Sequence, residues 1–311
     1  MTHILLETIL FAIGVTLLIK GADWLIQGSV LTARVLRISN LLIGLTVVAF
    51  GTSAPEMFVS IMAAIQQKPD ISIGNIMGSC TANIALVLGC AALLKPVTAS
   101  KTITFIKMPM LLGSALLITL VSWDLSLSRF DGILLLLAFA GFMWFSIFHE
   151  KQTQPVNDKP KSAPIIKDIL LIIIGLAGII IGAQILINSA TVLARTFGVS
   201  ELVIGISMVA IGTSLPEMAT SLVAVWKNEE DIGIANIVGS NIFNILLILG
   251  VVGLFSPILI NPRIMTTDIW IMNGFTILLF LFCLHRGFLN RTKGLILLAG
   301  YIAYIWYLFI R

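Results

Sequence analysis

The chain contains the stretch GTSAPEM at Gly51–Met57 and a near copy, GTSLPEM, at Gly212–Met218. A shift of 161 residues lays Gly44–Gly89 on Gly205–Gly250 without a gap, and 23 of the 46 aligned positions are identical. The identical positions include Glu, Pro, Asn, Thr and Ser, which two unrelated membrane helices would not share at a fixed offset. The chain is therefore an internal duplication.

The composition around the two copies is that of a membrane protein. Of 311 residues, 58% are hydrophobic and only 11% are charged, and the mean hydropathy is +1.07. An ordinary soluble protein is about 25% charged, and a disordered chain is more polar still. The long apolar runs also differ from the alternating strands of a membrane β-barrel. We expect an all-α polytopic membrane protein without a separate soluble domain.

The apolar segments are long enough to cross a bilayer at about 20 residues per crossing. A polar stretch at 150–163 divides them, so we expect a first repeat at 1–149, a linker loop at 150–163 and a second repeat at 164–311. Five spans is an odd number, which predicts two inverted five-helix repeats, as in many secondary transporters. The ten expected spans are 4–30, 40–65, 70–94, 102–122, 130–148, 164–191, 201–226, 231–255, 267–285 and 293–310.

The basic residues orient these spans. Five Lys and Arg lie on the side of the two termini and 13 on the side of the central loop, with Lys20 inside the first span. The positive-inside rule therefore places the loop in the cytoplasm and both termini outside. The first span has no basic leader or clear cleavage site, so we expect it to be retained. The basic residues form no stripe with aromatic residues, which argues against nucleic-acid binding.

Two glutamates, Glu56 and Glu217, lie near the middle of apolar spans at equivalent positions of the two repeats. A carboxylate at the bilayer centre costs about 2.5–3.5 kcal/mol on insertion scales, so it normally faces a cavity or a partner. One isolated glutamate could be protonated and bonded to a neighbouring helix. Two at equivalent positions, with no Lys or Arg near them in the sequence, favour a cation site.

Further oxygen donors accompany each glutamate. A Thr and a Ser precede it by about one turn, on the same helical face. Pro55 and Pro216 lack an N–H and interrupt the helix. We expect this to free carbonyls about one turn earlier, around Ala49 and Ala210 as well as Gly51 and Gly212, to point at an ion. The following helices add a Ser and an Asn one turn apart, although such residues can also join helices by hydrogen bonds. The candidate cation ligands are Ala49, Thr52, Ser53, Glu56, Ser79, Asn83, Ala210, Thr213, Ser214, Glu217, Ser240 and Asn244.

This set consists of oxygen atoms, which suits a hard cation such as Ca²⁺ with its six to eight oxygen ligands. No His or Cys is repeated, so zinc and copper are not expected. Two carboxylates match one Ca²⁺, or can be screened by several Na⁺. A site that holds either load but not both would support antiport. We expect no cofactor and no enzyme, since HExxH and GxSxG motifs are absent.

The paired GTSxPE…GS…N segments resemble the two α-repeats of the cation/calcium antiporter superfamily, specifically the bacterial-type sodium/calcium exchangers. The resemblance implies that the residues given above coordinate the cation. It also implies exchange of several Na⁺ entering for one Ca²⁺ leaving, across a bacterial inner membrane, by alternating access. The first and sixth helices, 4–30 and 164–191, would slide against the rest. The expected partners are Na⁺, Ca²⁺ and the lipid bilayer; a monomer is compatible with this, and the oligomeric state is open.

Three details of the motif bear on the coupling ion. Proton-coupled relatives tend to carry GNxxE, which favours Na⁺ coupling here. Potassium dependence is associated with an acid where this chain has Asn83 or Asn244. Cys80 stands where GSN is usual, whereas the second repeat has Asn241, so either the repeats are asymmetric or the ion selectivity departs from the family norm. An H⁺-coupled or K⁺-dependent antiporter and a cation channel are the alternatives.

A few polar residues outside the motif carry expectations of their own. Asp70 and Asp231 stand where the third and eighth spans begin, which predicts that they cap those helices. Lys20 and Asp23 are three residues apart in the first span, and we expect either a local pair or snorkelling toward the cytoplasmic face. The three cysteines lie in apolar segments and are expected to be small buried hydrophobes.

Overall fold

The computed structural model describes residues 2–153, 165–198, 212–284 and 287–310, and this part is almost entirely helical. Its first half begins with a long helix, α1, and contains three π-helical segments within longer helices. The elements of this half are α1 (Thr2–Leu36), α2 (Asn40–Ile43), a π-helical segment (Gly44–Val48), α3 (Ala49–Thr52), α4 (Ala54–Ile65), α5 (Pro69–Ala82), a π-helical segment (Asn83–Val87), α6 (Leu88–Leu94), β1 (Val97–Thr98), a π-helical segment (Ile103–Lys107), α7 (Met108–Val121), β2 (Ser126–Leu127) and α8 (Arg129–Thr153).

The second half follows the same order of elements. It starts with the long helix α9, and two of its π-helical segments match those of the first half in position. The described elements are α9 (Ile165–Thr196), α11 (Leu215–Trp226), α12 (Glu230–Ile242), a π-helical segment (Phe243–Ile248), α13 (Leu249–Phe255), β3 (Ile258–Leu259), a π-helical segment (Ile264–Asp268), α14 (Ile269–Leu284), β4 (Phe288–Leu289) and α15 (Arg291–Ile310).

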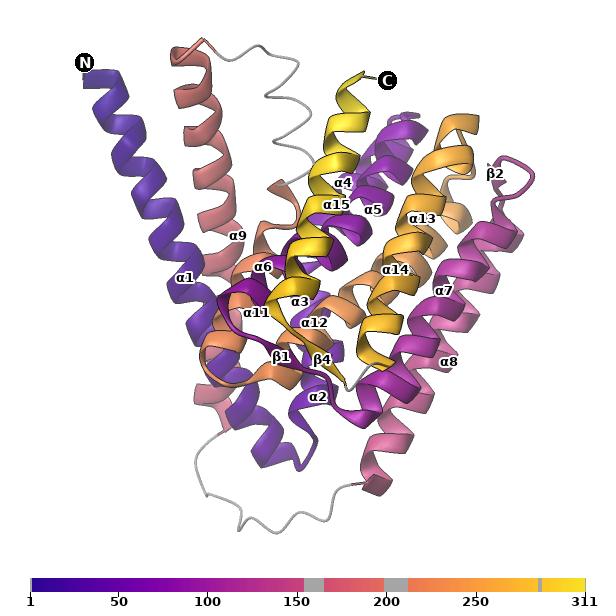
Figure 1. Cartoon of the computed structure of the whole chain (residues 1–311), viewed down its shortest axis with the longest axis horizontal. Coiled ribbons are helices and arrows are strands. Elements are labelled where there is room, and N and C mark those ends of the chain that lie inside the picture. The colour runs from indigo at the N-terminus through magenta and orange to yellow at the C-terminus, as the bar shows by residue number, and fades with distance from the viewer. Residues whose placement is uncertain (1, 154–164, 199–211, 285–286, 311) are drawn as a thin grey trace.

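These helices are those of a polytopic membrane protein. Among the described residues, seven helical stretches are long and apolar enough to cross a membrane, and the bent pair Asn40–Thr52 and Ala54–Ile65 makes an eighth. The all-helical membrane fold is therefore confirmed, while the count of ten spans stays a prediction. Both ends of the chain lie at one end of the molecule, and the adjoining ends of α8 and α9 lie at the other (Figure 1).

The internal repeat is visible in the backbone. Strand β1 pairs with β4 and β2 pairs with β3, both antiparallel, so each pair joins one strand from each half. Val97 and Ile258 are 161 residues apart, and so are the starts of the π-helical segments at Ile103 and Ile264. The two halves are thus interleaved, while the exact division at 1–149, 150–163 and 164–311 stays a prediction.

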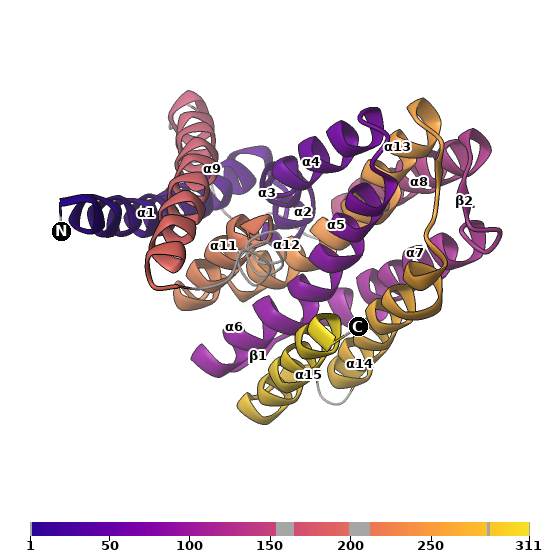
Figure 2. The ribbon, with the colours of Figure 1, turned by 90° about the horizontal axis from the view of Figure 1, so that it is seen from above.

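Helices α1 and α9 pack against each other at one side of the molecule, away from most of the bundle (Figures 1 and 2). Glycines on both helices allow their backbones to approach closely. A Cβ atom added to Gly21 would lie 2.7 Å from the backbone N of Ile179 and 2.8 Å from the carbonyl O of Gly175. A Cβ added to Gly182 would lie 2.8 Å from the backbone N of Leu18. Any larger residue would force the pair apart.

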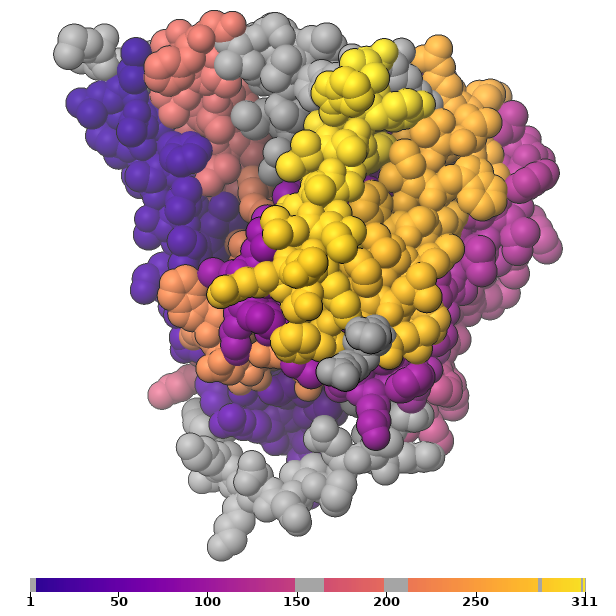
Figure 3. All heavy atoms as spheres, in the orientation of Figure 1, coloured from indigo at the N-terminus to yellow at the C-terminus, as the bar shows by residue number. Residues whose placement is uncertain are grey.

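The core lies between α5–α6 and α12–α13. Each percentage refers to the most apolar 18 residues of a helical stretch. Of these, 78% are buried in Pro69–Leu94 and 83% in Glu230–Phe255, compared with 17% in α1. The outer helices present apolar side chains outward, as a lipid environment requires. Helix α15 covers the middle of the face seen in Figure 3, and its Leu295, Ile302 and Trp306 are exposed.

Two expectations about polar residues were wrong. Helix α5 begins at Pro69 and α12 at Glu230, so Asp70 and Asp231 lie inside the first turn rather than at the cap. Proline is favoured at the first helical position because its φ is already helical, and a carboxylate in the first turn is still favourable to the helix dipole. Asp23 forms its ion pair with Lys227 of the α11–α12 turn rather than with Lys20.

Candidate cation site

The two motif prolines shape the backbone around the glutamates. The helix Asn40–Thr52 ends before Ser53, and α4 continues at an angle of 47° with Pro55 in its first turn. Helix α11 likewise begins at Leu215 with Pro216. The bend expected at Pro55 is therefore present. Both glutamates lie in the first turn of a helix, where the partial positive charge of the N-terminus favours a carboxylate.

Glu56 and Glu217 are completely buried and lack basic partners. The exposed fraction of each side chain is 0%, and neither forms an ion pair within the described residues. Both carboxylate oxygens of Glu56, and Oε2 of Glu217, have no hydrogen-bond partner there. The two carboxylates also lie close enough to repel each other. Buried charges are normally paired or bound to metal ions, so this pair is suited to hold cations.

The candidate ligands of the two repeats meet in the middle of the molecule. Ser53 Oγ donates to Glu217 Oε1 at 3.0 Å. The hydroxyls of Ser79 and Thr213 lie 3.1 Å apart, and those of Thr52 and Ser240 lie 3.4 Å apart. Each of these contacts joins one residue of the first repeat to one of the second. The structure thus places hydroxyls from α3, α5, the start of α11 and α12 in one cluster with the glutamates.

Two further residues belong to this cluster and were not among the predicted ligands. Asn236 Oδ1 accepts from the hydroxyl of Thr52 at 3.1 Å, and its Nδ2 donates to Ser221 Oγ at 3.1 Å. Asn75 is the equivalent residue of the first repeat. Its Oδ1 accepts from the hydroxyl of Thr213 at 3.4 Å, and its Nδ2 donates to Ser60 Oγ at 2.9 Å. Their signal in the sequence was the shared NIMGS and NIVGS segments, in which both asparagines are identical at the repeat offset.

The two candidate amide ligands, Asn83 and Asn244, lie where a helix takes on π geometry. One π-helical segment begins at Asn83, and the other spans Phe243–Ile248. Such bulges are frequent at functional sites because they turn side chains out of the regular helical pattern. Both asparagines are fully buried, and each has at least one amide atom that finds no hydrogen-bond partner in the described part of the chain. They can therefore offer oxygen to a cation.

The expectation for the backbone carbonyls was wrong in one respect. The Ala49 carbonyl is not freed by Pro55, because it accepts from Ser53 N at 3.0 Å and from Thr52 Oγ1 at 3.3 Å. The missing N–H of a proline affects the carbonyl four residues earlier, and this is the carbonyl of Gly51, which was also among those expected to be freed. Ser240 Oγ still reaches the Ala49 carbonyl at 3.5 Å, so that oxygen lies at the cluster. Ala210 lies outside the described residues.

Ser214 differs in its hydrogen bonding from Ser53, the equivalent residue of the first repeat. Its side chain is buried, and its Oγ has no hydrogen-bond partner among the residues that the structure describes, whereas the equivalent Ser53 donates to a glutamate. The eleven described candidate ligands are all buried except Thr213, which is partly buried. In the part of the chain described here, no group of three or more His, Cys, Asp or Glu could hold a metal ion. The oxygen donors of the cluster are mainly hydroxyls and amides around two carboxylates.

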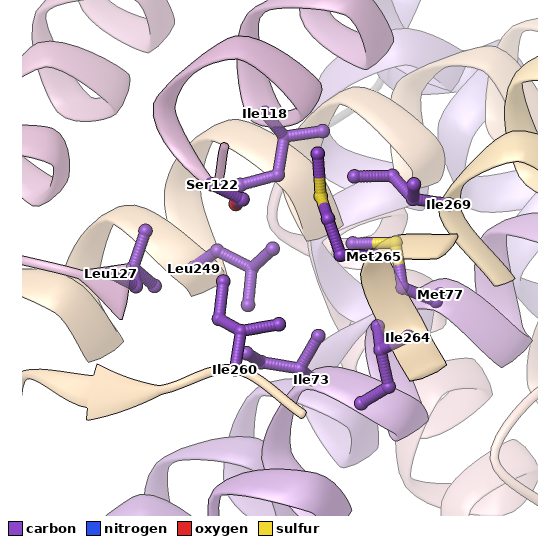
Figure 4. Close-up of a pocket in the computed structure, with 10 residues that line it drawn as sticks. All are labelled: Ile73, Met77, Ile118, Ser122, Leu127, Leu249, Ile260, Ile264, Met265 and Ile269. Carbon is purple, nitrogen blue, oxygen red and sulfur yellow. The ribbon is translucent and has the colours of Figure 1, made fainter. Parts of the chain in front are cut away.

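Two cavities differ in whether they could serve an ion. The pocket in Figure 4 lies among α5, α7, α13 and the segment before α14, and Ser122 is the one polar residue among its lining side chains there. A cation that entered that pocket would lose its water ligands, and the apolar side chains would not supply oxygen ligands in their place. A second cavity is lined by Ser79 of the cluster and by Asn75, Asp70 and Asp268 among other residues. This second cavity borders the candidate site.

Comparisons with known proteins agree with this arrangement. The sequence profile of the family described as "Sodium/calcium exchanger protein" matches residues 6–148 and again 167–310. The chain is 39% identical over 316 residues to "Putative antiporter CaxA" of Alkalimonas amylolytica, covering 98% of this chain and 99% of that protein. It is 35% identical to "Inner membrane protein YrbG" of Escherichia coli (strain K12) over 312 residues, covering 97% and 96%.

A solved structure matches over nearly its whole length. The sodium-calcium exchanger NCX_Mj superposes with a TM-score of 0.86 at 33% sequence identity, covering 98% of this chain and 99% of that one. NCX_Mj was studied after soaking without Na⁺ and Ca²⁺, and with Na⁺, Ca²⁺ or Sr²⁺. At this identity and coverage, the likeness extends beyond the fold to the sequence as a whole.

Proposed function

This chain belongs to the sodium/calcium exchanger family of cation/Ca²⁺ exchange transporters, and we propose that it couples the movement of Ca²⁺ to that of Na⁺. The chain is thus a membrane transporter and not an enzyme, and the ions are its cargo rather than a cofactor. In our proposal Glu56 and Glu217 hold the cations, assisted by the hydroxyl and amide oxygens around them. Helices α1 and α9 would then move against the bundle to expose the site alternately to the two sides.

The proposal rests on the pair of buried glutamates, which have no basic partner in the ranges that the structure describes. Two carboxylates in a site of low dielectric constant need about two positive charges, and one Ca²⁺ or two or more Na⁺ can supply them. The two loads need the same carboxylates, so binding of one excludes binding of the other. Mutually exclusive loads are the requirement for exchange, because the ion leaving must make way for the ion entering.

The close packing of α1 on α9 supports the moving part of the proposal. Their shared glycine surface keeps them together as a unit, while their contacts with the rest of the described chain involve mainly α11 and α2–α3. A unit with few contacts to the core can slide without breaking the core itself. We propose the cytoplasmic membrane of a bacterium as the location, with both termini outside and the central loop inside.

Protons are the competing coupling ion. Each carboxylate could be neutralised by one proton instead of by Na⁺, which would give an H⁺-coupled exchanger with the same site. Asn83 and Asn244, rather than acids, at the two amide positions favour a mode that does not require K⁺. A channel would pass Ca²⁺ without any counter-ion.

The test is Ca²⁺ uptake into proteoliposomes with imposed Na⁺, K⁺ or H⁺ gradients, compared side by side, with empty liposomes as the control. We expect ⁴⁵Ca²⁺ uptake to follow an outward Na⁺ gradient and to persist without K⁺ and without a pH gradient. Uptake that follows the pH gradient in the absence of Na⁺ would overturn Na⁺ coupling. Uptake that needs no counter-ion would overturn exchange.

A further inference from the structure

Cys80 and Asn241 occupy equivalent positions of the two repeats and meet between them. Asn241 Nδ2 donates to the carbonyl O of Cys80 at 3.1 Å, and Cys80 Sγ lies 3.9 Å from the carbonyl O of Asn241. Both side chains are buried, with exposed fractions of 0% and 1%. The contact therefore lies on the axis that relates the two halves, directly beside the candidate amide ligands.

This contact determines how Asn83 is oriented. The carbonyl of Cys80 can only accept a hydrogen bond, so Asn241 must present its NH₂ group there and its Oδ1 elsewhere. Asn241 Oδ1 accepts from Asn83 Nδ2 at 3.0 Å. The Asn83 NH₂ group is thereby engaged, and its Oδ1, which is buried and has no partner within the described residues, is the atom left for a cation. A backbone carbonyl thus orients one ligand through two amides.

Asn244 has no such support. It is the counterpart of Asn83, and the residue that would orient it is residue 80, as Asn241 orients Asn83. Cys80 is the neighbour that can interact with the Asn244 amide, but a thiol is a weak hydrogen-bonding group and orients an NH₂ group less firmly than the Asn241 oxygen orients that of Asn83. Both Asn244 Nδ2 and Asn244 Oδ1 lack a hydrogen-bond partner in the described structure.

We propose that Asn241 is a positioning residue which aims the Asn83 oxygen at Ca²⁺, and that Cys80 leaves Asn244 unoriented. The two repeats then contribute unequal amide ligands, Asn83 being strong and Asn244 weak. The inference rests on the proposed function, since it concerns how the same site grips its Ca²⁺. An amide that is free to rotate presents its NH₂ group to the cation part of the time, and this group repels the cation.

Exchange of the two residues is the sharpest test. Equilibrium ⁴⁵Ca²⁺ binding to the purified protein is measured for Asn83→Ala and Asn244→Ala, in the natural background and in the double variant Cys80→Asn/Asn241→Cys. In the natural background we expect Asn83→Ala to raise Kd about 10-fold and Asn244→Ala about 2-fold, which is the range of one hydrogen bond or ligand contact. In the double variant we expect this order to be reversed.

The same order in both backgrounds would overturn the inference, because a merely structural role of residues 80 and 241 would not transfer the sensitivity from one asparagine to the other. Should the double variant fail to fold, Cys80→Asn alone decides. It supplies the missing oxygen and should lower the Kd for Ca²⁺ by about 3- to 10-fold, a gain of one well-placed hydrogen bond. An unchanged or higher Kd would contradict the inference. Cys90→Ser, at a partly buried cysteine outside the site, is the matched control.

Binding also separates this inference from the proposed function. Absence of Ca²⁺ binding by the unmodified protein would overturn both together. Ca²⁺ binding with the predicted reversal, but without Na⁺-driven uptake, would support the orientation of the two amides and contradict the Na⁺ coupling. Na⁺-driven uptake with an unchanged order of sensitivities would support the transport function and overturn this inference alone.

Discussion

The hydrogen bonds around the two glutamates follow the internal repeat closely, whereas those around the two turns at the ends of the molecule do not. At the centre, Asn75 contacts Thr213 and Ser60, and Asn236 contacts Thr52 and Ser221 in the same manner. The paired hydroxyls of Ser79 with Thr213 and of Thr52 with Ser240 complete the match. Cys80 and Asn241 depart from this symmetry, because these equivalent positions carry different residues.

The α11–α12 turn and its counterpart between α4 and α5 differ in charge. Lys227 pairs with Asp23 of α1, and Glu229 accepts from Asn40 at 2.8 Å. Glu230, at the start of α12, pairs with Lys95 at 2.9 Å. In the repeat alignment, the counterparts of Asp23 and Lys227 are the neutral residues Gln184 and Gln66. Within the described residues, charged contacts therefore tie α1 to the bundle at one end and not at the other.

The comparison indicates what constrains each region. A site that binds the same cations from both sides of a membrane keeps matching ligands in its two halves. The ends of the molecule face different compartments and need not match. An ion pair between α1 and the α11–α12 turn would stabilise one position of α1, the helix proposed to move. The neutral residues at the equivalent positions of the other end would not favour a competing position. Variants in either region test this explanation of why the centre follows the repeat and the ends do not.

Apart from loss of a glutamate, the largest effect is expected at the centre, from loss of Asn75 or Asn236. Asn75→Ala and Asn236→Ala should each lower kcat/KM for Ca²⁺ uptake by about 5- to 100-fold, since a buried hydroxyl that loses its acceptor costs about 1–3 kcal/mol. Because the two contacts are equivalent, the two losses should agree within a few-fold. Asn188→Ala, on the exposed face of α9, is the control. A large loss in one variant and none in the other would contradict the symmetry of the centre.

A smaller effect is expected where α1 packs on α9. Gly21→Ala and Gly182→Ala would each place a methyl group within 3 Å of the facing backbone. Overpacking of this kind costs about 1–3 kcal/mol, so both variants should lower the Tm measured in detergent and slow exchange. Gly141→Ala, at an exposed position of α8, should leave the Tm unchanged or slightly higher. Normal stability of both α1–α9 variants would mean that the close approach of the two helices is not required.

The smallest effect is expected from the ion pair between Asp23 and Lys227. The side chains are 25% and 33% exposed, and pairs near a surface contribute about 0.2–1 kcal/mol. Asp23→Asn or Lys227→Gln should therefore change the ratio of the Ca²⁺ KM values on the two sides of oriented vesicles by no more than about 5-fold. The double reversal Asp23→Lys/Lys227→Asp should restore the ratio.

Gln66→Ala, at the neutral counterpart of Lys227, is the control for the ion pair. It should leave the ratio of KM values unchanged. A shift as large as that of Lys227→Gln would show that charge does not distinguish the two ends.

Much of this arrangement could be predicted from the sequence, because the strongest signals are local. The apolar runs predicted the all-helical membrane fold, and the repeated motif predicted that the helix bends at Pro55. The structure brings together Ala49, Thr52 and Ser240, and likewise Ser53 with Glu217 and Ser79 with Thr213. Whether they bind ions is a separate prediction, which the distances between them do not test. For Ala210, even the position stays a prediction.

The errors and omissions arise where a contact depends on residues far apart in the chain. Asp23 has Lys20 three positions away, yet it pairs with Lys227 because α1 packs against the end of α11. Asn75 and Asn236 were visible as identical residues, but the contact with the threonine of the other repeat appears only in three dimensions. Asp70 was displaced from the cap because Pro69 takes the first helical position. Local patterns do not contain this information.

The central claim is that Glu56 and Glu217 together hold the transported cations. The direct measurement is Na⁺-gradient-driven ⁴⁵Ca²⁺ uptake by Glu56→Gln and Glu217→Gln in proteoliposomes, with Asp124→Asn at an exposed acid as the control. Glutamine keeps the shape of the side chain and removes its charge, and gel filtration and Tm establish that each variant is folded. The account predicts that either substitution abolishes uptake while the control retains it. Unchanged uptake in both glutamine variants would contradict it.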